Sequence, residues 1–214
     1  MIELVTTDGI FALDGGEWEV TNNIWLIGDD REVLVVDAAH DHRPIVDAVN
    51  GRRVTAIACT HGHNDHINAA ADLADAVDAP VWLHPADRML WDVVHPDRAP
   101  DRELAGGTVL EAARGVELGV LHTPGHSPGC CCFHLATPTA GTAGPGVVFT
   151  GDTLFCGGPG ATGRSHSDFP TIVDSIRRDL LALPPETVVH TGHGESTTIG
   201  DEAPHLQDWI DRGH

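Results

Sequence analysis

Residues 54–67 read Val-Thr-Ala-Ile-Ala-Cys-Thr-His-Gly-His-Asn-Asp-His-Ile, an apolar run that leads into three histidines and one aspartate. The apolar part is short enough for a buried β-strand. The polar part brings His61, His63, Asp65 and His66 together at the end of that strand. Neutral imidazole is the commonest metal ligand in proteins, and carboxylate is its usual partner around zinc or iron. The stretch therefore predicts a strand that delivers metal ligands at its carboxyl end.

A histidine-rich surface loop is the simpler alternative, because the chain contains 15 histidines in 214 residues. Three later turns favour the metal site. In each, an apolar strand ends, a glycine lies nearby and a metal-binding side chain follows: His126 in residues 123–126, Asp152 in 149–152 and His193 in 191–193. Such turns gather at the carboxyl ends of strands in α/β sheets. The seven side chains exceed the three or four protein ligands of one zinc, so they predict two metals with one bridging group.

The remaining sequence alternates strands and helices in both halves, which indicates an α/β protein with one domain spanning residues 1–214. The first half predicts strands at 20–27, 32–36, 54–59 and 81–83, helices at 42–50 and 67–79, and within 85–101 a short helix and a loop that covers a pocket. The second half predicts antiparallel strands within 108–135, strands at 147–149 and 187–190, loops at 137–146 and 157–167, and helices at 170–183 and in the tail to 214.

Composition limits the classes of function. The chain has 32 acidic and 12 basic residues, a net charge of −20, and no lysine. Such a surface repels phosphate backbones and anionic membranes, so neither nucleic acid nor membrane is an expected partner. Five cysteines form no spaced disulfide framework. The sequence has no 18-residue apolar run and no secretory start, so we expect a cytoplasmic protein. The oligomeric state is not predicted.

The ordered pattern His-x-His-x-Asp-His, His, Asp, His resembles the metallo-β-lactamase superfamily over nearly the whole chain. That resemblance implies a four-layered αββα sandwich, with two mixed sheets flanked by helices. It also implies that Asp152 bridges two metals and that Asp65, at the start of a helix, offsets the positive helix end beside the second metal. Asp65 and Asp152 are the implied catalytic carboxylates. The implied ligands of the first metal are His61, His63 and His126, and those of the second are Asp65, His66 and His193.

The glyoxalase II branch is the more specific resemblance. It is carried by Thr-Pro-Gly-His-Ser-Pro-Gly at 123–129, Phe-Thr-Gly-Asp-Thr-Leu-Phe at 149–155 and Gly-His-Gly at 192–194. This branch implies hydrolysis of an acyl thioester of a low-molecular-weight thiol, with two divalent ions, zinc first and iron or manganese as alternatives. Arg164 aligns with basic positions that approach substrate in related thioesterases, and a surface position without contact to substrate is the alternative. The chain has no tyrosine or lysine and ends 21 residues after His193, so glutathione is not the expected thiol.

Two other activities compete with the thioesterase. A persulfide dioxygenase would hold one iron on His61, His63 and Asp152, with His126 as a neighbouring ligand or support. A β-lactamase is less favoured, because the best-known zinc subclass has cysteine in place of Asp152 and uses a lysine. His190 is the alternative to His193 as a ligand. Cys156 is expected to pack in the interior, and the alternative is that it lines the pocket. Five other histidines are expected to be surface or hydrogen-bonded residues and not metal ligands: His84, His95, His122, His134 and His166. Among them, His122 and His166 are the strongest candidates for a ligand role.

Overall fold

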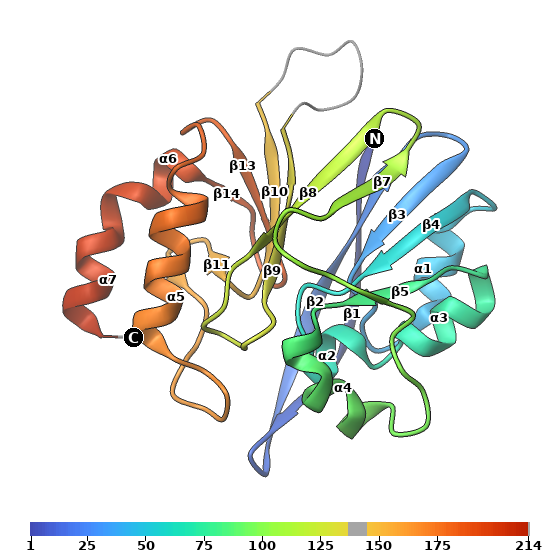
Figure 1. The fold of residues 1–214 in the computed structure, drawn as a ribbon, viewed down its shortest axis with the longest axis horizontal. Coiled ribbons are helices and arrows are strands. Elements are labelled where there is room, and N and C mark those ends of the chain that lie inside the picture. Colours follow the sequence, from blue (N-terminus) through green and yellow to red (C-terminus); the bar gives the residue numbers. More distant parts are fainter. Residues whose placement is uncertain (137–144, 214) are drawn as a thin grey trace.

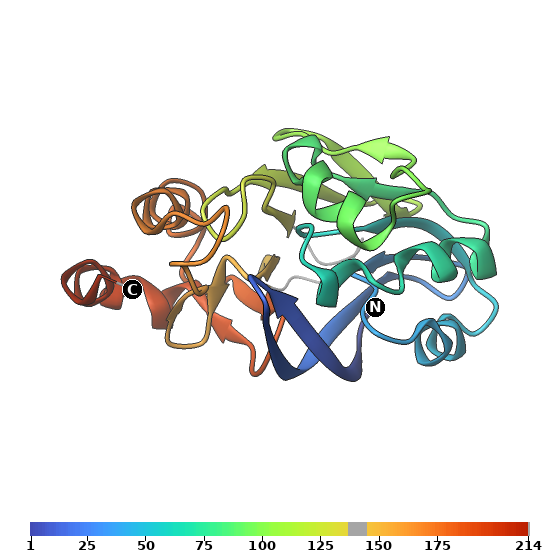
Figure 2. The same ribbon diagram turned by 90° about the horizontal axis from the view of Figure 1, so that it is seen from below.

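The computed structural model describes residues 1–136 and 145–213, and in it two six-stranded sheets pack face to face with helices outside each (Figure 1). Seen from below, the orange and red helices near the C-terminus lie at one end and the blue and teal helices of the first half at the other (Figure 2). The strands lie between these two groups of helices. The arrangement confirms the predicted αββα sandwich with two mixed sheets.

The first sheet has the strand order β1-β2-β3-β4-β5-β6. Strand β2 is antiparallel to both of its neighbours, β1 and β3. The strands from β3 to β6 are parallel to one another. The β1–β2 hairpin turns at Asp14 and Gly15, whose φ angles of 52° and 77° suit a two-residue hairpin turn. The bounds are β1 Ile2–Leu13, β2 Gly16–Gly28, β3 Glu32–Val36, β4 Arg53–Ala58, β5 Val81–Leu83 and β6 Arg102–Glu103.

The second sheet has the order β14-β13-β10-β9-β8-β7, and in it β10 and β13 are parallel while the other neighbours are antiparallel. A separate short pair, β11 and β12, follows β10. The bounds are β7 Val109–Ala113, β8 Val116–His122, β9 Cys131–Leu135, β10 Val147–Gly151, β11 Leu154–Phe155, β12 Gly158–Pro159, β13 Val188–Thr191 and β14 Thr197–Thr198.

The helices have amphipathic sequences that bury one face against a sheet. The α-helices are α1 His42–Val49, α2 Asn64–Ile67, α3 Ala70–Val77, α4 Arg88–Val94, α5 Phe169–Ser175, α6 Ile199–Glu202 and α7 Leu206–Arg212. Two short 3-10 helices, η1 Pro85–Asp87 and η3 Ala203–His205, and one π-helix, η2 Ile176–Leu180, complete them.

Three apolar clusters correspond to the three interfaces of the sandwich. One lies between the first sheet and α1, α3 and α4, and includes Ile45, Leu73 and Trp91. The second lies between the two sheets. The third joins the second sheet to α5, η2, α6 and α7, and includes Ile172 and Trp209. The rims of these layers, where strands end, are left for polar side chains.

Several sequence predictions need correction. Strand β1 was not predicted. The expected helix at 67–79 is found as the shorter α3, Ala70–Val77, and Ile67 ends the preceding α2. The two helices are separate because the N–H of Ala69 donates to the carbonyl of Ala38 and leaves the helical pattern. The expected loop at 137–146 falls mainly on residues outside those described. Among the described residues no helix is both long and apolar enough to cross a membrane.

Candidate metal centre

The predicted metal-binding side chains meet at one edge of the sandwich, beyond the carboxyl ends of several strands. His61 follows β4, Asp152 follows β10 and His193 follows β13. His126 comes from the loop between β8 and β9. Two parallel pairs of strands, one in each sheet, therefore deliver ligand-type side chains to the same place, as expected for open α/β sheets.

The first group of side chains consists of three buried imidazoles. Nε2 of His61 lies 3.0 Å from Nδ1 of His63, which lies 3.0 Å from Nε2 of His126. The three ring nitrogens lie within 4.8 Å of one another, close enough to bind one ion. The structure thus brings together the residues that the sequence predicted for the first metal.

The second group consists of Asp65, His66 and His193, and it has similar spacing. Oδ2 of Asp65 is 3.5 Å from Nε2 of His66 and 3.3 Å from Nε2 of His193, and the two imidazole nitrogens are 3.2 Å apart. Asp65 lies in the first turn of α2. The residues predicted for the second metal are therefore also brought together.

Asp152 lies between the two groups. Its Oδ1 is 3.2 Å from Nε2 of His66, and its Oδ2 is 3.5 Å from Nε2 of His193 and 3.6 Å from Nε2 of His126. A Cβ at position 192 would approach Oδ1 of Asp152 to 2.4 Å, so Gly192 is required for this packing. Asp152 thus reaches both groups, as a bridging ligand must.

Hydrogen bonds fix the proton positions of four of these histidines. Carbonyl and carboxylate oxygens only accept, so Nδ1 donates in His66 to Asp37, in His126 to Ala161 and in His193 to Thr21, each at 2.8 Å. The single proton of the Thr60 hydroxyl is donated to Asp37, so this hydroxyl accepts from Nδ1 of His61. In the neutral form of each of these four rings, the nitrogen facing the centre has the lone pair that metal binding requires.

The donor set fits metal ions. Nitrogens bound to one tetrahedral zinc at about 2.0–2.1 Å lie roughly 3.3 Å apart, which is close to the spacing found here. Two carboxylate oxygens, Oδ1 of Asp65 and Oδ1 of Asp152, are buried without a hydrogen-bond partner in the described part of the chain. A buried anionic oxygen without a partner is costly, and a cation removes that cost. The cluster is compatible with a binuclear metal site.

The two groups differ in electrostatics. Burial lowers the pKa of His61 well below its usual range and, together with His126, lowers the pKa of His63 to about 3. Burial acts in the same direction on His66 and His193, but Asp152 and Asp65 outweigh it, raising the pKa of His66 well above its usual range and that of His193 to about 10. His61 and His63 are therefore neutral imidazoles, and the second group carries carboxylate charge that a proton or a metal ion must balance.

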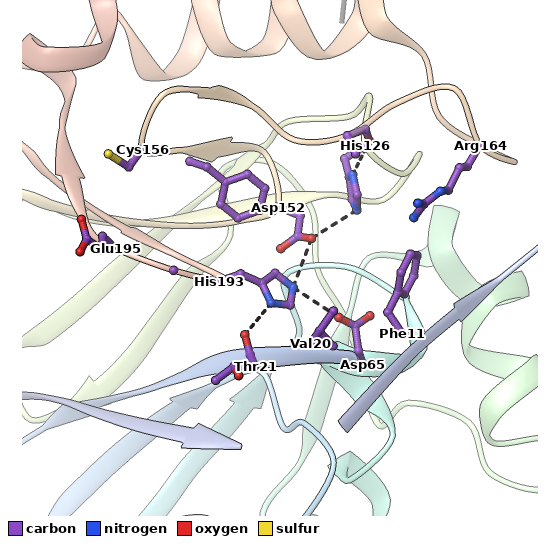
Figure 3. A pocket seen from close by; sticks show the side chains of 13 residues that line it. Phe11, Val20, Thr21, Asp65, His126, Asp152, Cys156, Arg164, His193 and Glu195 are labelled. Atoms are coloured by element: carbon purple, nitrogen blue, oxygen red, sulfur yellow. Dashed lines mark hydrogen bonds and ion pairs between the residues drawn. The ribbon is translucent and has the colours of Figure 1, made fainter. Parts of the chain in front are cut away.

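A pocket of about 480 Å³ opens onto this cluster (Figure 3). Phe11, Val20 and Phe155 supply an apolar wall. Arg164 also lines the pocket, with its guanidinium 3.9 Å from the ring centre of Trp18 and 5.2 Å from that of Phe11. Within the described ranges this guanidinium forms no ion pair, although, after the hydrogen bonds from Ser165, its charge contributes to the lowered pKa of nearby Asp14. No residue of 85–101 lines this pocket, and Pro85, Arg88 and Pro100 from that segment line a separate pocket instead.

Other sequence candidates have different environments. His190 stacks on Trp25 and bonds to Ser196, away from the two groups. His122 donates from Nε2 to the carbonyl of Pro128, and its ring stacks on His84. Cys156 is exposed at the pocket, and the expectation that it packs in the interior was wrong because β11 and β12 leave it at a turn on the surface.

Three polar residues around the cluster were not predicted: Asn22, Asp37 and Asp87, all buried. Asp37 directly follows the apolar run of β3, so the same strand-end signal that revealed Asp152 would have found it. Asn22 lies inside β2, and Asp87 ends η1. Neither of these two positions carries a recognisable sequence signal.

A sandwich of two mixed sheets with a buried histidine and aspartate cluster at its strand ends defines the class of metallo-hydrolases. The chain belongs to the metallo-beta-lactamase superfamily, whose family model matches residues 18–193. It is similar to the hydroxyacylglutathione hydrolase GloC of Haemophilus influenzae, with 29% identity over 84% of this chain and 87% of that protein.

Solved structures show the same likeness. The structure of TTHA1623 in a di-iron-bound form is 34% identical to this chain in sequence, with a TM-score of 0.73. The match covers 86% of this chain and 93% of the TTHA1623 chain. The B3 metallo-beta-lactamase BLEG-1 is 27% identical with a TM-score of 0.76, covering 94% of this chain and 98% of its own. These relatives share the fold and include different named activities.

Proposed function

We propose that this protein is a metal-dependent hydrolase that cleaves the acyl thioester of a low-molecular-weight thiol, using two divalent ions, zinc in preference to iron or manganese. The observation that carries the proposal is the position of Asp152 between two three-residue groups of ligand atoms. The named activity of GloC supports the thioester over other substrates. The absence of lysine and the presence of Asp152 disfavour a β-lactam substrate.

Each residue has a defined part in this proposal. Bound ions would supply a water acidic enough to attack at neutral pH and Lewis acidity for the carbonyl and the leaving thiolate. Asp152 holds the two groups of ligands together, and Asp65 gives the second group its negative charge. Arg164 binds an anionic part of the substrate, because its guanidinium lines the pocket and forms no ion pair among the residues described. Phe11 and Phe155 contact the apolar part.

The experiment combines metal analysis with turnover. Protein purified without added metal is analysed for zinc, iron and manganese, then offered a panel of acyl thioesters of small thiols, a persulfide with oxygen monitoring, and a β-lactam. Two ions per chain with thioester hydrolysis support the proposal. One iron per chain with persulfide-dependent oxygen consumption overturns it in favour of a persulfide dioxygenase, and β-lactam hydrolysis without thioesterase activity also overturns it.

A pair of variants tests the ligands themselves. His126→Ala removes a nitrogen from the first group, so we expect loss of metal and of turnover. His122→Ala is the matched control, because His122 ends β8 just before the loop of His126 and belongs to neither ligand group. If His126→Ala keeps full metal content and full activity, the proposed ligand set is wrong.

A further inference from the structure

Asn22 is a fully buried residue of β2 whose side-chain amide lies against the second ligand group. Its Nδ2 is 3.1 Å from Oδ2 of Asp65, 3.3 Å from Nε2 of His66 and 3.5 Å from Nε2 of His193. The amide is thus nearly equidistant from the three atoms proposed to hold the second metal. The ligand patterns discussed above do not include this position.

A chain of hydrogen bonds decides which end of the amide faces Asp65. The backbone N–H of His40 donates to Oδ1 of Asn68 at 2.6 Å, so Nδ2 of Asn68 faces Nδ1 of His40 at 3.2 Å. His40 Nδ1 therefore accepts, and the ring proton is on Nε2. That nitrogen donates to Oδ1 of Asn22 at 2.8 Å. Nδ2 of Asn22 is left as the donor to Asp65.

The fold holds His40 in this position. His40 has a φ of 59°, in the left-handed region that few non-glycine residues adopt. Gly9 of β1 lies against its ring, and a Cβ at position 9 would be 2.1 Å from Nδ1 of His40. The strand β1, the loop after β3 and the end of α2 thus converge to orient one imidazole toward Asn22.

We propose that Asn22, oriented by His40, is a positioning residue of the second metal site. Its amide fixes the carboxylate of Asp65 so that Oδ2 faces the nitrogens of His66 and His193. Within the described residues Asp65 has no other neutral hydrogen-bond donor, since Oδ1 is unpartnered and the remaining neighbours of Oδ2 are those two imidazoles. Loss of the amide frees Asp65 to rotate and weakens the second site alone.

This inference rests on the proposed binuclear centre but is independent of the thioester substrate. It is tested by calorimetric titration of zinc into chelator-treated protein, with circular dichroism and thermal unfolding to confirm that each variant is folded. In Asn22→Ala we expect second-site affinity to fall about 10- to 100-fold, as for other groups that orient metal ligands, with first-site affinity unchanged. His40→Ala should give a smaller fall at the same site, and His40→Gln, which keeps a donor, should restore most of it.

Thr7→Val is the matched control. Thr7 pairs directly with Asn22 across the β1–β2 hairpin, is also buried, and bonds to the carbonyl of Ala39, not to a ligand. It should leave both affinities unchanged. If the parent chain binds two ions and Asn22→Ala binds both equally well, or loses affinity at both sites alike, the positioning role is overturned while the binuclear centre stands. If the parent chain binds only one ion, the binuclear centre fails, and the inference fails with it.

Discussion

Oδ2 of Asp37 lies 2.8 Å from Nδ1 of His66 and accepts a hydrogen bond from it. The same oxygen accepts from the hydroxyl of Thr60, which in turn accepts from Nδ1 of His61. One buried carboxylate therefore sets the proton position of a histidine in each of the two ligand groups. Asp37 itself has a φ of 62°, a conformation that aspartate and asparagine tolerate better than most residues.

We expect Asp37→Asn to weaken both metal sites. Asparagine keeps the size and suits the same backbone conformation. Its NH2 group replaces one carboxylate oxygen, however, and cannot accept the hydrogen bonds that this oxygen now accepts from Thr60 or His66. Removing the partner of a ligating histidine typically lowers metal affinity about 10- to 100-fold. Competition with a chromophoric chelator measures the change, and Asp41→Asn, on a half-buried residue of the same loop that pairs with Arg43, is the control. Unchanged affinity in Asp37→Asn would show that the Asp37 bond does not orient the ligands.

Asp87 is a second buried carboxylate, and it stabilises the loops that carry the ligands by accepting three hydrogen bonds. Its Oδ2 accepts from the N–H of Gly62 at 2.8 Å and from the hydroxyl of Ser127 at 2.6 Å, and its Oδ1 accepts from the N–H of Gly129 at 2.6 Å. Cβ atoms at positions 62 and 129 would lie 2.9 Å and 2.6 Å from Asp87 atoms, so both glycines allow this approach. The carboxylate joins the loop of His61 and His63 to the loop of His126.

We expect Asp87→Ala to destabilise the protein by at least about 3 kcal/mol, because three buried donors each lose their acceptor at about 1–3 kcal/mol. Urea denaturation of the metal-free protein measures this. Asp92→Ala, which removes an exposed carboxylate paired with Arg88 on the same helix, should change the free energy of unfolding by less than about 0.5 kcal/mol. Equal effects of the two substitutions would contradict the role given to Asp87.

The sequence predicted the ends of strands and the ligand residues more reliably than their surroundings. His61, Asp152 and His193 each follow a local apolar run, so a short window contains their whole signal. Strand β1 has no such signal, because its residues are mostly half-buried or exposed and only Thr7 is buried. The partners of Asp87 lie 25 to 42 residues away in sequence. Contacts of that kind exist only after the loops have been brought together by the fold.

Arg164 provides a test of substrate binding. Its guanidinium rests on Trp18 and Phe11 at the pocket, so an anionic substrate group would meet a preoriented donor. With the thioester that the panel identifies, we expect Arg164→Ala to lower kcat/KM about 10- to 100-fold, mainly through KM, because a charge-assisted hydrogen bond is lost in both ground and transition states. Arg164→Lys should lie between. Arg43→Ala, on an exposed arginine paired with Asp41, should match the parent enzyme. A fall confined to kcat would contradict simple substrate anchoring.

His190 and His84 predict a pH dependence of stability. Burial lowers the pKa of His190 to about 4, and burial with the charge of neighbouring His122 lowers that of His84 to about 4. In the unfolded chain a histidine takes up its proton near pH ~6.5. Between pH ~4 and ~6.5 the unfolded state therefore binds more protons than the folded state, so the free energy of unfolding rises with pH across this window and falls on acidification. Replacing both with glutamine removes these two groups, and we expect a shallower slope of unfolding free energy against pH, measured by urea titrations of metal-free protein from about pH 4.5 to 7. A double variant that keeps the full slope would show that the pH dependence comes from other groups.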